Sequence, residues 1–417
     1  MGDESANYNL NLRDFSQNET ILNGDIGTLG DSLDNSLTII DLKSMSQTSL
    51  IDGFTISGAQ ADSSGLGVKG LYGGGILSYA KTGNINLSVR NCLFKNNYCG
   101  SSGGGIYNFG STATASLSVE NCKFFANTTS FSGAAIEGES GSSGNSIVNV
   151  KNTEFRASKN GNIRNLGNAN SALFTCEGCL FSGNIIASSR ASLINYNAGG
   201  NTVSNLINCT FSGNKAFLGA GVFNRGGLVN RTNTLFWNND DSSNPDGIEL
   251  SNGGTFSIKN SMIEGSSDNT SGNIPCTDPL FVTNLDPLTA PALGGNFSLQ
   301  NCSPIMDKGL NDSVKVAFKK DLLGFTRIFN GSGQASAIVD LGAYEYQSVI
   351  YPVSLNLVDD INTDTNSIVT EDITANNTVI NPARVLYQAG ESILLDQGFE
   401  VENGSVFRAE IGLFTCP

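Results

Sequence analysis

The sequence predicts an all-β protein, a parallel β-helix solenoid followed by a small C-terminal β module. Two short motifs alternate between residues 70 and 265. One reads Gly-Gly-Gly-Ile or a close variant, and the other reads Asn-Cys-x-Phe-x-x-Asn. The phenylalanine of the second motif recurs every 25–31 residues, at Phe94, Phe124, Phe155, Phe181, Phe211 and Phe236. Repeats of this length indicate a solenoid, in which each repeat packs on its neighbours.

The pattern within each repeat indicates strands rather than helices. Segments 87–94 and 116–124 alternate apolar and polar residues, which is the period of a β-strand. Asn, Gly or Ser ends each such segment after a few residues, so that three short strands and three turns make one coil. We expect inward-facing side chains to stack like on like between coils, and in one repeat these are Ile106, Leu117, Val119, Cys122 and Phe124.

Asparagine and glycine mark the expected bends. Asn tolerates the left-handed backbone of a sharp turn and can hydrogen-bond along a stack. One such column is Asn91, Asn121, Asn152, Asn208, Asn233 and Asn260. A second column follows each phenylalanine by three residues, at Asn97, Asn127, Asn184, Asn214 and Asn239. The glycine runs are expected at another corner, where the backbone passes closely.

Composition excludes several functions. A net charge of −15 argues against nucleic acid and anionic membranes as partners. No apolar run reaches the length of about 18 residues that a membrane span needs, so we expect none. The chain has no His, which excludes His-based triads and His metal ligands. The first ten residues lack the apolar stretch of a signal peptide, which fits a mature or truncated N-terminus.

Nine cysteines are present, an odd number. Cys92 and Cys122 on adjacent coils share a repeat position, as do Cys179 and Cys209. Parallel side chains on adjacent coils suit a disulfide poorly, so we expect free buried thiols there. Cys176 and Cys179 form a CxxC motif, but both fall at inward positions, which argues against zinc. Cys276 and Cys302 are one coil apart near the end of the repeats, and the sequence does not decide whether they form a disulfide.

The chain divides into four parts. Residues 1–47 form an irregular N-terminal segment and the first coil, and residues 48–347 form the β-helix, with closing coils and a cap from about residue 266. Residues 348–382 are a linker and strands, and residues 383–417 form a small β module that turns at Gly398 and Gly404.

Several stretches carry a family resemblance. They are LRDFSQNETILNGDIG (residues 12–27), GDSLDNS (30–36), LIDGFTISGA (50–59), TDPLF (277–281), NFSLQNCSPIMDKG (296–309) and VDLGAYEYQ (339–347). They are similar to bacterial secreted β-helix proteins of the choice-of-anchor Q family. Residues 383–416 resemble the three-coathanger stack found at the ends of secreted Bacteroidetes proteins, through AGESILLDQGF and GSVFRAEIG.

The resemblance implies a right-handed β-helix on or outside the cell, and it implies little chemistry because the family is named for its architecture. Two departures stand out. Family members usually carry about a hundred residues before LRDF, which this chain lacks, so we expect an exposed first edge that could support assembly into an oligomer or filament. No recognisable anchoring segment follows Cys416.

An enzymatic hypothesis is a Ca²⁺-assisted polysaccharide lyase or a glycoside hydrolase acting on acidic polysaccharide. A lyase needs a cation and a base, and a glycosidase needs two carboxylates across a groove. Candidate bases are Arg190, Arg225 and Arg231, and candidate carboxylates are Asp240, Asp241, Asp246 and Glu249. Solvated surface is the competing interpretation of this acidic loop. Arg231 falls at the inward position of Val119, which requires either a bulged coil or a buried, paired arginine.

Calcium is the one cofactor that the sequence suggests. Asp25, Asp31, Asp34 and Asn35 lie in one glycine-containing loop, and hard oxygen ligands at this density suit Ca²⁺, although the loop matches no known calcium motif. Glu137 and Glu139 follow a Gly-Ala-Ala-Ile copy of the first motif, and we expect both on an exposed face.

The favoured function is structural or adhesive and non-catalytic. A stiff rod with flat faces suits binding to glycans, cell-surface partners or other protein subunits, outside the cell or on its surface. The aromatic side chains that could stack on sugars are Tyr72, Tyr79, Tyr107, Phe109, Tyr196 and Trp237. Packing within the protein is the competing interpretation of each.

Overall fold

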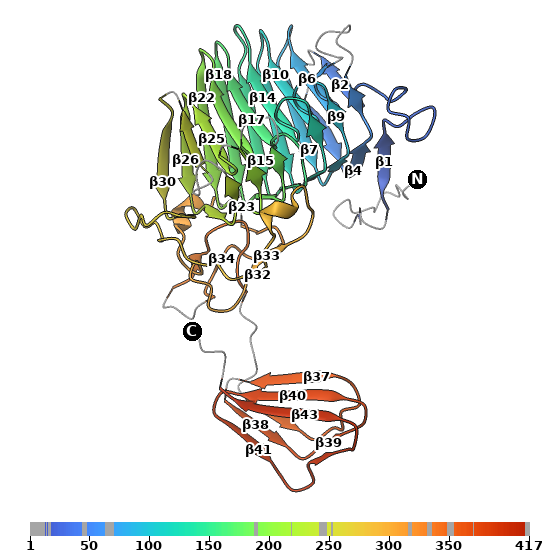
Figure 1. Cartoon of the computed structure of the whole chain (residues 1–417), viewed down its shortest axis with the longest axis vertical. Coiled ribbons are helices and arrows are strands. Elements are labelled where there is room, and N and C mark those ends of the chain that lie inside the picture. The colour runs from blue at the N-terminus through green and yellow to red at the C-terminus, as the bar shows by residue number, and fades with distance from the viewer. Residues whose placement is uncertain are drawn as a thin grey trace. The chain divides into compact units, whose positions relative to one another are not determined.

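The structure, a computed structural model, contains a long parallel β-helix and a smaller β unit (Figure 1). Unit 1 is Met1–Tyr346 and unit 2 is Gln347–Pro417. Of residues 248–251 only the backbone is described. The described residues are 13, 15, 18–43, 48–62, 71–186, 191–217, 219–241, 248–251, 253–315, 319–331, 336–347, 354–369 and 371–412.

Three long parallel sheets form the walls of the β-helix, and each coil runs through sheets B, C and A in turn. Sheet A contains β1 (Thr20–Asn23), β4 (Phe54–Ser57), β8 (Leu93–Lys95), β12 (Lys123–Phe125), β16 (Glu154–Arg156), β19 (Leu180–Ser182), β23 (Thr210–Ser212), β27 (Leu235–Trp237) and β31 (Met262–Ile263). Sheet B contains β2 (Ile40–Lys43), β6 (Ile76–Ala80), β10 (Ile106–Gly110), β14 (Ile136–Ser140), β17 (Ile163–Gly167), β21 (Leu193–Asn197), β25 (Val222–Arg225) and β29 (Ile248–Ser251).

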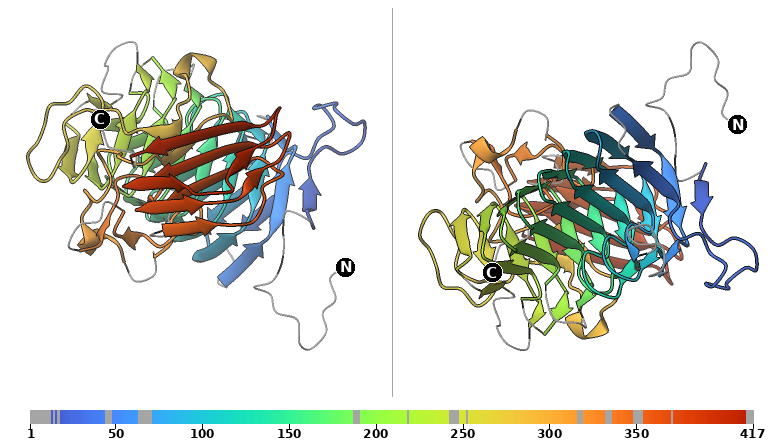
Figure 2. Two further views of the ribbon diagram at one scale, coloured as in Figure 1. Left: turned by 90° about the horizontal axis from the view of Figure 1, so that it is seen from below. Right: turned by 90° about the horizontal axis from the view of Figure 1, so that it is seen from above.

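Sheet C contains β3 (Thr48–Asp52), β7 (Ile85–Arg90), β11 (Ala115–Glu120), β15 (Ser146–Lys151), β18 (Ser171–Glu177), β22 (Asn201–Ile207), β26 (Leu228–Thr232) and β30 (Thr255–Lys259). Two-residue strands pair at the corner between sheets A and B, namely β5 (Gln60–Ala61), β9 (Tyr98–Cys99), β13 (Thr128–Thr129), β20 (Ile185–Ile186), β24 (Lys215–Ala216) and β28 (Asp240–Asp241). Figure 2 shows the succession of coils, from blue to yellow, in two further directions.

The predicted like-on-like stacking is confirmed. Ile106 pairs with Ile76 on one side and Ile136 on the other. The six phenylalanines of the second motif stack in the lumen with ring centroids 4.4–5.2 Å apart. Ile56 precedes them in the same column, because β4 pairs Ile56 with Phe94. These rings are fully buried and form the centre of the core.

The asparagine columns have different roles. In the first column every residue adopts the left-handed conformation, with φ between 42° and 54°, as the sequence predicts. The second column is buried and hydrogen-bonded along the stack, for example from Asn184 Nδ2 to Asn214 Oδ1 at 2.8 Å and from Asn214 Nδ2 to Asn239 Oδ1 at 2.9 Å. A third buried column, which the sequence did not reveal, links Asn165 to Asn195 and Asn195 to Asn224.

The glycine corner is as tight as expected. Gly103 has a φ of 76°, and a Cβ on Gly104 would lie 2.7 Å from the carbonyl oxygen of Ala134 in the next coil. A side chain larger than hydrogen therefore does not fit at this position without moving the neighbouring coil.

The cap extends the coils only in part. Ile274 still pairs with Met262 as a partial further coil. The rest folds back over the outer face of sheet A, where Phe281 and Phe297 pack against Leu180 and Leu235. Its elements are β32 (Phe281–Thr283), β33 (Asn296–Leu299), β34 (Ile328–Phe329), β35 (Ile338–Val339) and the short 3-10 turns η3 (Pro287–Thr289) and η4 (Asn311–Ser313). Figure 1 shows this yellow and orange segment beside β23.

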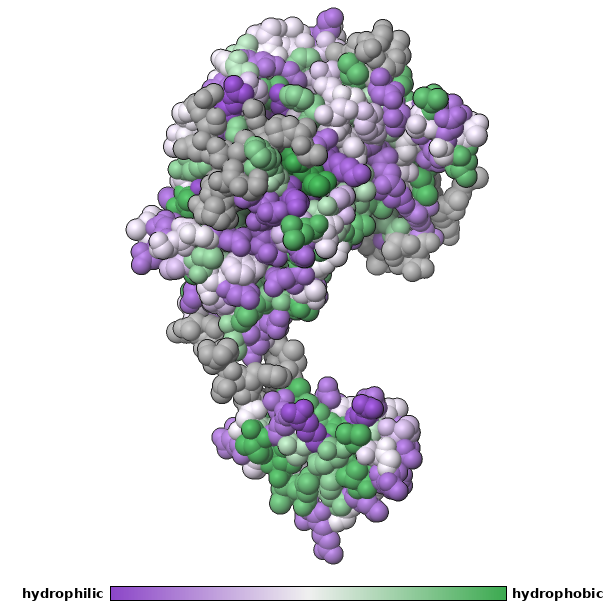
Figure 3. All heavy atoms as spheres, in the orientation of Figure 1, coloured by the Kyte–Doolittle hydropathy of each residue, from purple (hydrophilic) through white to green (hydrophobic). Residues whose placement is uncertain are grey.

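Unit 2 is itself a short stack of parallel coils. Three sheets contain β36 (Ser354–Leu357), β38 (Asp372–Ala375) and β41 (Ser392–Leu395); β37 (Thr365–Val369), β40 (Arg384–Ala389) and β43 (Val406–Ile411); and β39 (Thr378–Val379) and β42 (Glu400–Val401). Tyr387 is the centre of its core, with Phe407 edge-on to the ring. The strands expected between residues 348 and 382 thus belong to the same unit as residues 383–412. Figure 3 shows hydrophobic side chains gathered on the visible face of this unit.

Strands are already present before residue 48, in the part expected to hold an irregular segment and the first coil, because β1 pairs with β4 and β2 with β6. The many aspartates and serines before residue 48 weaken the alternation of apolar and polar residues by which strands β1 and β2 could have been recognised. Within the described part of the chain, no helix is long and apolar enough to cross a membrane.

We expect the second asparagine column to be essential for stability. Asn127→Ala removes the acceptor of Asn97 Nδ2 and of the Asn97 backbone amide, and the donor to the Phe94 carbonyl. Leaving these buried groups unpaired should cost roughly 2–4 kcal/mol. Guanidinium unfolding measures the effect. Asn149→Ala, on the exposed face of sheet C, is the matched control and should change stability by less than about 0.5 kcal/mol. Equal effects of the two substitutions would contradict this role.

Candidate ligand-binding face

The outer face of sheet B brings together aromatic and charged side chains from successive coils. Alternate residues of its strands point away from the lumen in two rows. The first row is Leu77, Tyr107, Glu137, Arg164, Ile194 and Phe223. The second row is Tyr79, Phe109, Glu139, Leu166, Tyr196 and Arg225. The first row is buried except for Arg164, whereas the second is half-buried except for Leu166.

We name part of this face the ring-and-arginine strip, which comprises Tyr79, Phe109, Phe131, Arg164, Tyr196 and Arg225. At one end the rings of Tyr79 and Phe109 stack with centroids 5.3 Å apart and planes 3° from parallel. Tyr107 lies beneath, fully buried, with its centroid 5.7 Å from that of Phe109. Aromatic side chains at half-exposed positions of a rigid sheet provide apolar area and hydroxyl groups at low conformational cost.

At the other end rings and guanidinium groups alternate from strand to strand. Arg164 of β17 lies 5.2 Å from the ring centroid of Phe131 and 5.8 Å from that of Tyr196. Arg225 of β25 lies 4.8 Å from the Tyr196 centroid. Phe131 is 61% exposed. Cation–π contacts of this kind hold a guanidinium in place without a carboxylate.

The two glutamates of β14 are less accessible than predicted. Glu137 is wholly buried rather than exposed, and it accepts a hydrogen bond from Arg164 at 2.8 Å. Burial raises its pKa to about 7, against the opposing effect of Arg164. Glu139 is half-buried and accepts hydrogen bonds from the Tyr107 hydroxyl and the Asn168 amide. Both carboxylates are therefore engaged by neighbouring side chains.

The two described arginines among the proposed catalytic bases, Arg225 and Arg231, do not converge. Arg231 continues the inward column in register between Leu206 and Ile258, without a bulge, and is 2% exposed. The arginine is buried, as one of the two predicted alternatives required, but the pairing that this alternative expected is wrong. The guanidinium stacks on Phe256 at 4.3 Å, and its Nε and Nη1 have no hydrogen-bond partner. Burial lowers the pKa of Arg231 to about 9. Arg190 lies outside the described residues.

The two described carboxylates of the acidic loop after β27 are each engaged by a neighbouring group. Asp240 forms an ion pair with Lys215 of the preceding coil at 3.1 Å. Asp241 is buried and accepts a hydrogen bond from the Gly219 amide. Asp246 lies outside the described residues, and the side chain of Glu249, in the first row of sheet B, is not described.

The side chains suggested as calcium ligands form hydrogen bonds with backbone groups in or beside their loop. Asp34 accepts the Thr28 amide at 2.7 Å, Asp25 the Gly30 amide and Asp31 the Leu33 amide. Asn35 donates to the Gly58 carbonyl at 3.1 Å. In the ranges that the structure describes, no three Cys, Asp or Glu side chains are arranged to hold a metal ion. Calcium binding by this loop stays a prediction.

The cysteines of the coils are free and buried, as expected for a core column. These are Cys92, Cys99, Cys122, Cys176, Cys179 and Cys209. Cys276 is an exposed free thiol, whereas Cys302 is in a disulfide, so the two are not bridged to each other.

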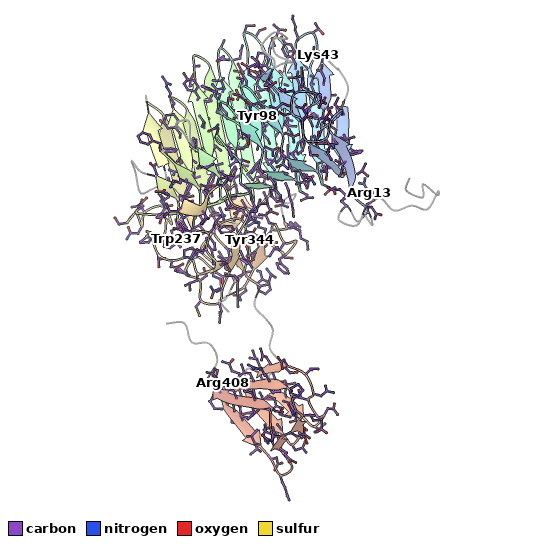
Figure 4. The ribbon with its side chains drawn as sticks, turned by 45° about the vertical axis from the view of Figure 1, so that its right-hand side comes forward. Arg13, Lys43, Tyr98, Trp237, Tyr344 and Arg408 are labelled. Carbon is purple, nitrogen blue, oxygen red and sulfur yellow. The ribbon has the colours of Figure 1, made fainter. Side chains whose placement is uncertain are left out.

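Tyr72 packs against Tyr107 with ring centroids 4.6 Å apart. The last aromatic candidate and two hollows lie elsewhere. Trp237, labelled in Figure 4, is half-buried where the cap meets the last coils, and Tyr344 packs against the same apolar cluster. One hollow, between the cap and a coil corner, is lined by Asn96, Ala126, Thr128, Ala157, Lys159, Pro291, Ala292 and Leu293. The other is lined by Phe15, Glu19, Phe54, Asn91, Lys123 and neighbours, and its Glu19 is already bonded to Thr55 and Lys95.

No protein-family profile matches this chain, and no curated protein is significantly similar to it in sequence. The resemblance to the choice-of-anchor Q family therefore stays a prediction, and the functional argument rests on the geometry of the strip.

The sequence missed Arg164 and Phe131 as members of the strip. The signal that would have found Arg164 is the repeat itself. Glu137 and Arg164 follow equivalent glycine corners on adjacent coils, so aligning all outward positions, rather than motifs alone, places these opposite charges side by side. No comparable signal marks Phe131, which lies in a turn between strands.

Two buried arginines should respond oppositely to the same substitution. Arg231→Met removes an unpaired charge from an apolar column and should raise stability by about 1–4 kcal/mol. Arg327→Met should lower stability by about 3–5 kcal/mol, because Arg327 donates to the Gly342 and Ala343 carbonyls and lies among buried carboxylates. Thermal and guanidinium unfolding of both variants measure this. Destabilisation by Arg231→Met would show that its guanidinium has a favourable role.

The Glu137 carboxyl should make stability depend on pH. Its pKa is raised from 4.5 to about 7, so the folded protein retains a proton that the unfolded chain releases in that window. The resulting stabilisation is complete below about pH 4.5 and is lost as the pH rises through 7. Relative to Glu137→Gln, the wild type should lose of the order of 2–3 kcal/mol between these values.

Unfolding free energies at several pH values measure this difference. Glu120→Gln, on the outer face of sheet C, is the control and should keep the pH dependence of the wild type. Parallel pH profiles for the wild type and Glu137→Gln would contradict the raised pKa.

Proposed function

We propose that this protein is an extracellular or cell-surface β-helix that binds glycans or other cell-surface partners without catalysis. The observation that carries the proposal is the ring-and-arginine strip, where aromatic rings and guanidinium groups line up across coils while the nearby carboxylates are engaged. The extracellular location rests on the family resemblance alone. Other protein subunits and assembly into a filament stay as further partners to test.

The mechanism of binding follows from the rigidity of the sheet. Except for Phe131, the strip side chains project from strands that are paired on both sides, so little conformational freedom is lost when a ligand binds. Rings can contact the apolar face of a sugar, and the Tyr79 hydroxyl and the arginine N–H groups can donate hydrogen bonds to its oxygens. A linear glycan lying along the strip would meet several coils at once.

The second candidate is a Ca²⁺-assisted polysaccharide lyase or a glycoside hydrolase. It is favoured by the proximity of Glu137, Arg164 and Glu139 on adjacent strands. Against it, Glu137 is inaccessible and ion-paired, and Glu139 is held by two donors. A general acid or base must reach the proton that it transfers, which a wholly buried carboxylate does not.

The test of the binding proposal is a glycan array followed by calorimetry on the glycans that bind. The double substitution Tyr79→Ala/Phe109→Ala should weaken binding at least tenfold, because each ring contributes buried apolar area. Ser118→Ala/Asn149→Ala, at outward positions of sheet C, is the control pair and should bind like the wild type. Circular dichroism checks that both variants are folded.

The enzymatic alternative is tested with the same protein on a panel of acidic polysaccharides, with and without Ca²⁺, by following unsaturated products and reducing ends. Product formation that disappears in Glu139→Gln would replace the binding proposal with catalysis. An array on which no glycan binds, or on which the control pair loses as much affinity as the ring variant, would also refute it.

A further inference from the structure

The strip ends in an arginine whose charge is unmatched. Arg225, half-buried at the end of β25, stacks its guanidinium on the Tyr196 ring. No carboxylate described in the structure forms an ion pair with it, and no hydrogen bond joins its N–H groups to described residues. The guanidinium therefore has a fixed position and unused donors.

This arrangement differs from that of most charges on the coils. Charges on neighbouring coils are usually neutralised by ion pairs across one strand spacing, as in Arg90–Glu120, Lys123–Glu154, Lys151–Glu177 and Lys215–Asp240. Around Tyr196 the outward neighbours on β17, β21 and β25 are Arg164, Leu166, Ile194 and Phe223, with no acidic side chain among them. No side chain that neutralises Arg225 lies among those described, which do not include that of Glu249 on the adjacent strand β29.

We infer that Arg225, with Tyr196 and Arg164, forms a subsite for the carboxylate of a uronic-acid residue in a bound glycan. This inference rests on the proposed glycan binding and specifies its ligand. The guanidinium fork matches a carboxylate through two parallel N–H···O bonds, and the ring contact holds the fork in one orientation. Arg164 adds positive charge one strand beyond Tyr196, partly offset by Glu137.

The net charge of −15 does not prevent such binding. Charges separated by more than about 8 Å are largely screened at physiological ionic strength, so the charged groups beside the ligand determine the electrostatic part of its affinity. At the Tyr196 end of the strip the described charged groups are Arg225, Arg164 and the buried Glu137 that pairs with Arg164. Glu139, the outward carboxylate nearest in the second row, lies two strands from Tyr196 and is bonded to Tyr107 and Asn168.

Isothermal titration calorimetry with defined hexasaccharides tests the inference. The probes are oligogalacturonate and oligomannuronate, their fully methyl-esterified forms, and a neutral galactan of the same length. Wild-type protein should bind at least one acid at least tenfold more tightly than its ester. Arg225→Met, which retains the apolar stem, should abolish this preference, lowering affinity for the acids much more than affinity for the esters and neutral glycans. Arg225→Lys should be intermediate, since it keeps the charge and loses the fork.

Arg90→Met is the matched control, because Arg90 is an exposed arginine on the outer face of sheet C. It should bind all probes like the wild type. Equal affinity for acid and ester, or an acid preference that persists in Arg225→Met, would overturn the carboxylate subsite while leaving glycan binding intact. Failure of every glycan on the array and of every probe would instead overturn the proposed function as a whole.

Discussion

The coils of unit 1 depend on the in-register parallel pairing of equivalent residues one coil apart. Strands that stack about 4.8 Å apart place each side chain directly over its counterpart, so a position is stable only if it tolerates a near-copy of itself. Phenylalanine satisfies this by ring stacking, with Phe181 and Phe211 only 1° from parallel. Asparagine satisfies it because its amide is both donor and acceptor, so one residue type can form a continuous buried chain of hydrogen bonds.

The same constraint is unfavourable for charges, because identical charges one strand apart repel. The edge of sheet C solves this by alternation, since Asp52, Arg90, Glu120, Lys151 and Glu177 follow one another in register with alternating sign. Each of the three inner charges then lies between two opposite ones. Sheet B solves it differently between β17 and β25, where an aromatic ring separates two arginines and accepts both. Arg164 is also paired with Glu137, whereas no described side chain neutralises Arg225.

The fold could be predicted because a repeated motif reports the same environment several times. The phenylalanine, asparagine and glycine columns identified the core, the bends and the corner, and the burial of Cys176 and Cys179 followed from their repeat positions. The path of the cap was not predictable, because residues 266–347 contain no repeat and pack by apolar contacts far apart in sequence. The site was harder still, since its members are single residues on different coils. Glu137 was misplaced because its burial depends on corner loops rather than on strand alternation.

The distribution of surfaces explains why a ligand face should lie on sheet B. The cap covers the outer face of sheet A at its later coils, where Leu180 and Leu235 are wholly buried. Along the middle of sheet C the outward residues are short and polar, among them Ser88, Ser118 and Asn149, and these are followed by the self-neutralising charge row. Among the described side chains, sheet B is where half-exposed rings and a guanidinium without a described counterion share one row. In-register stacking favours rows of side chains whose charges cancel. A charge left without a described counterion at a rigid, half-exposed position, such as that of Arg225, is best explained by a partner of opposite charge.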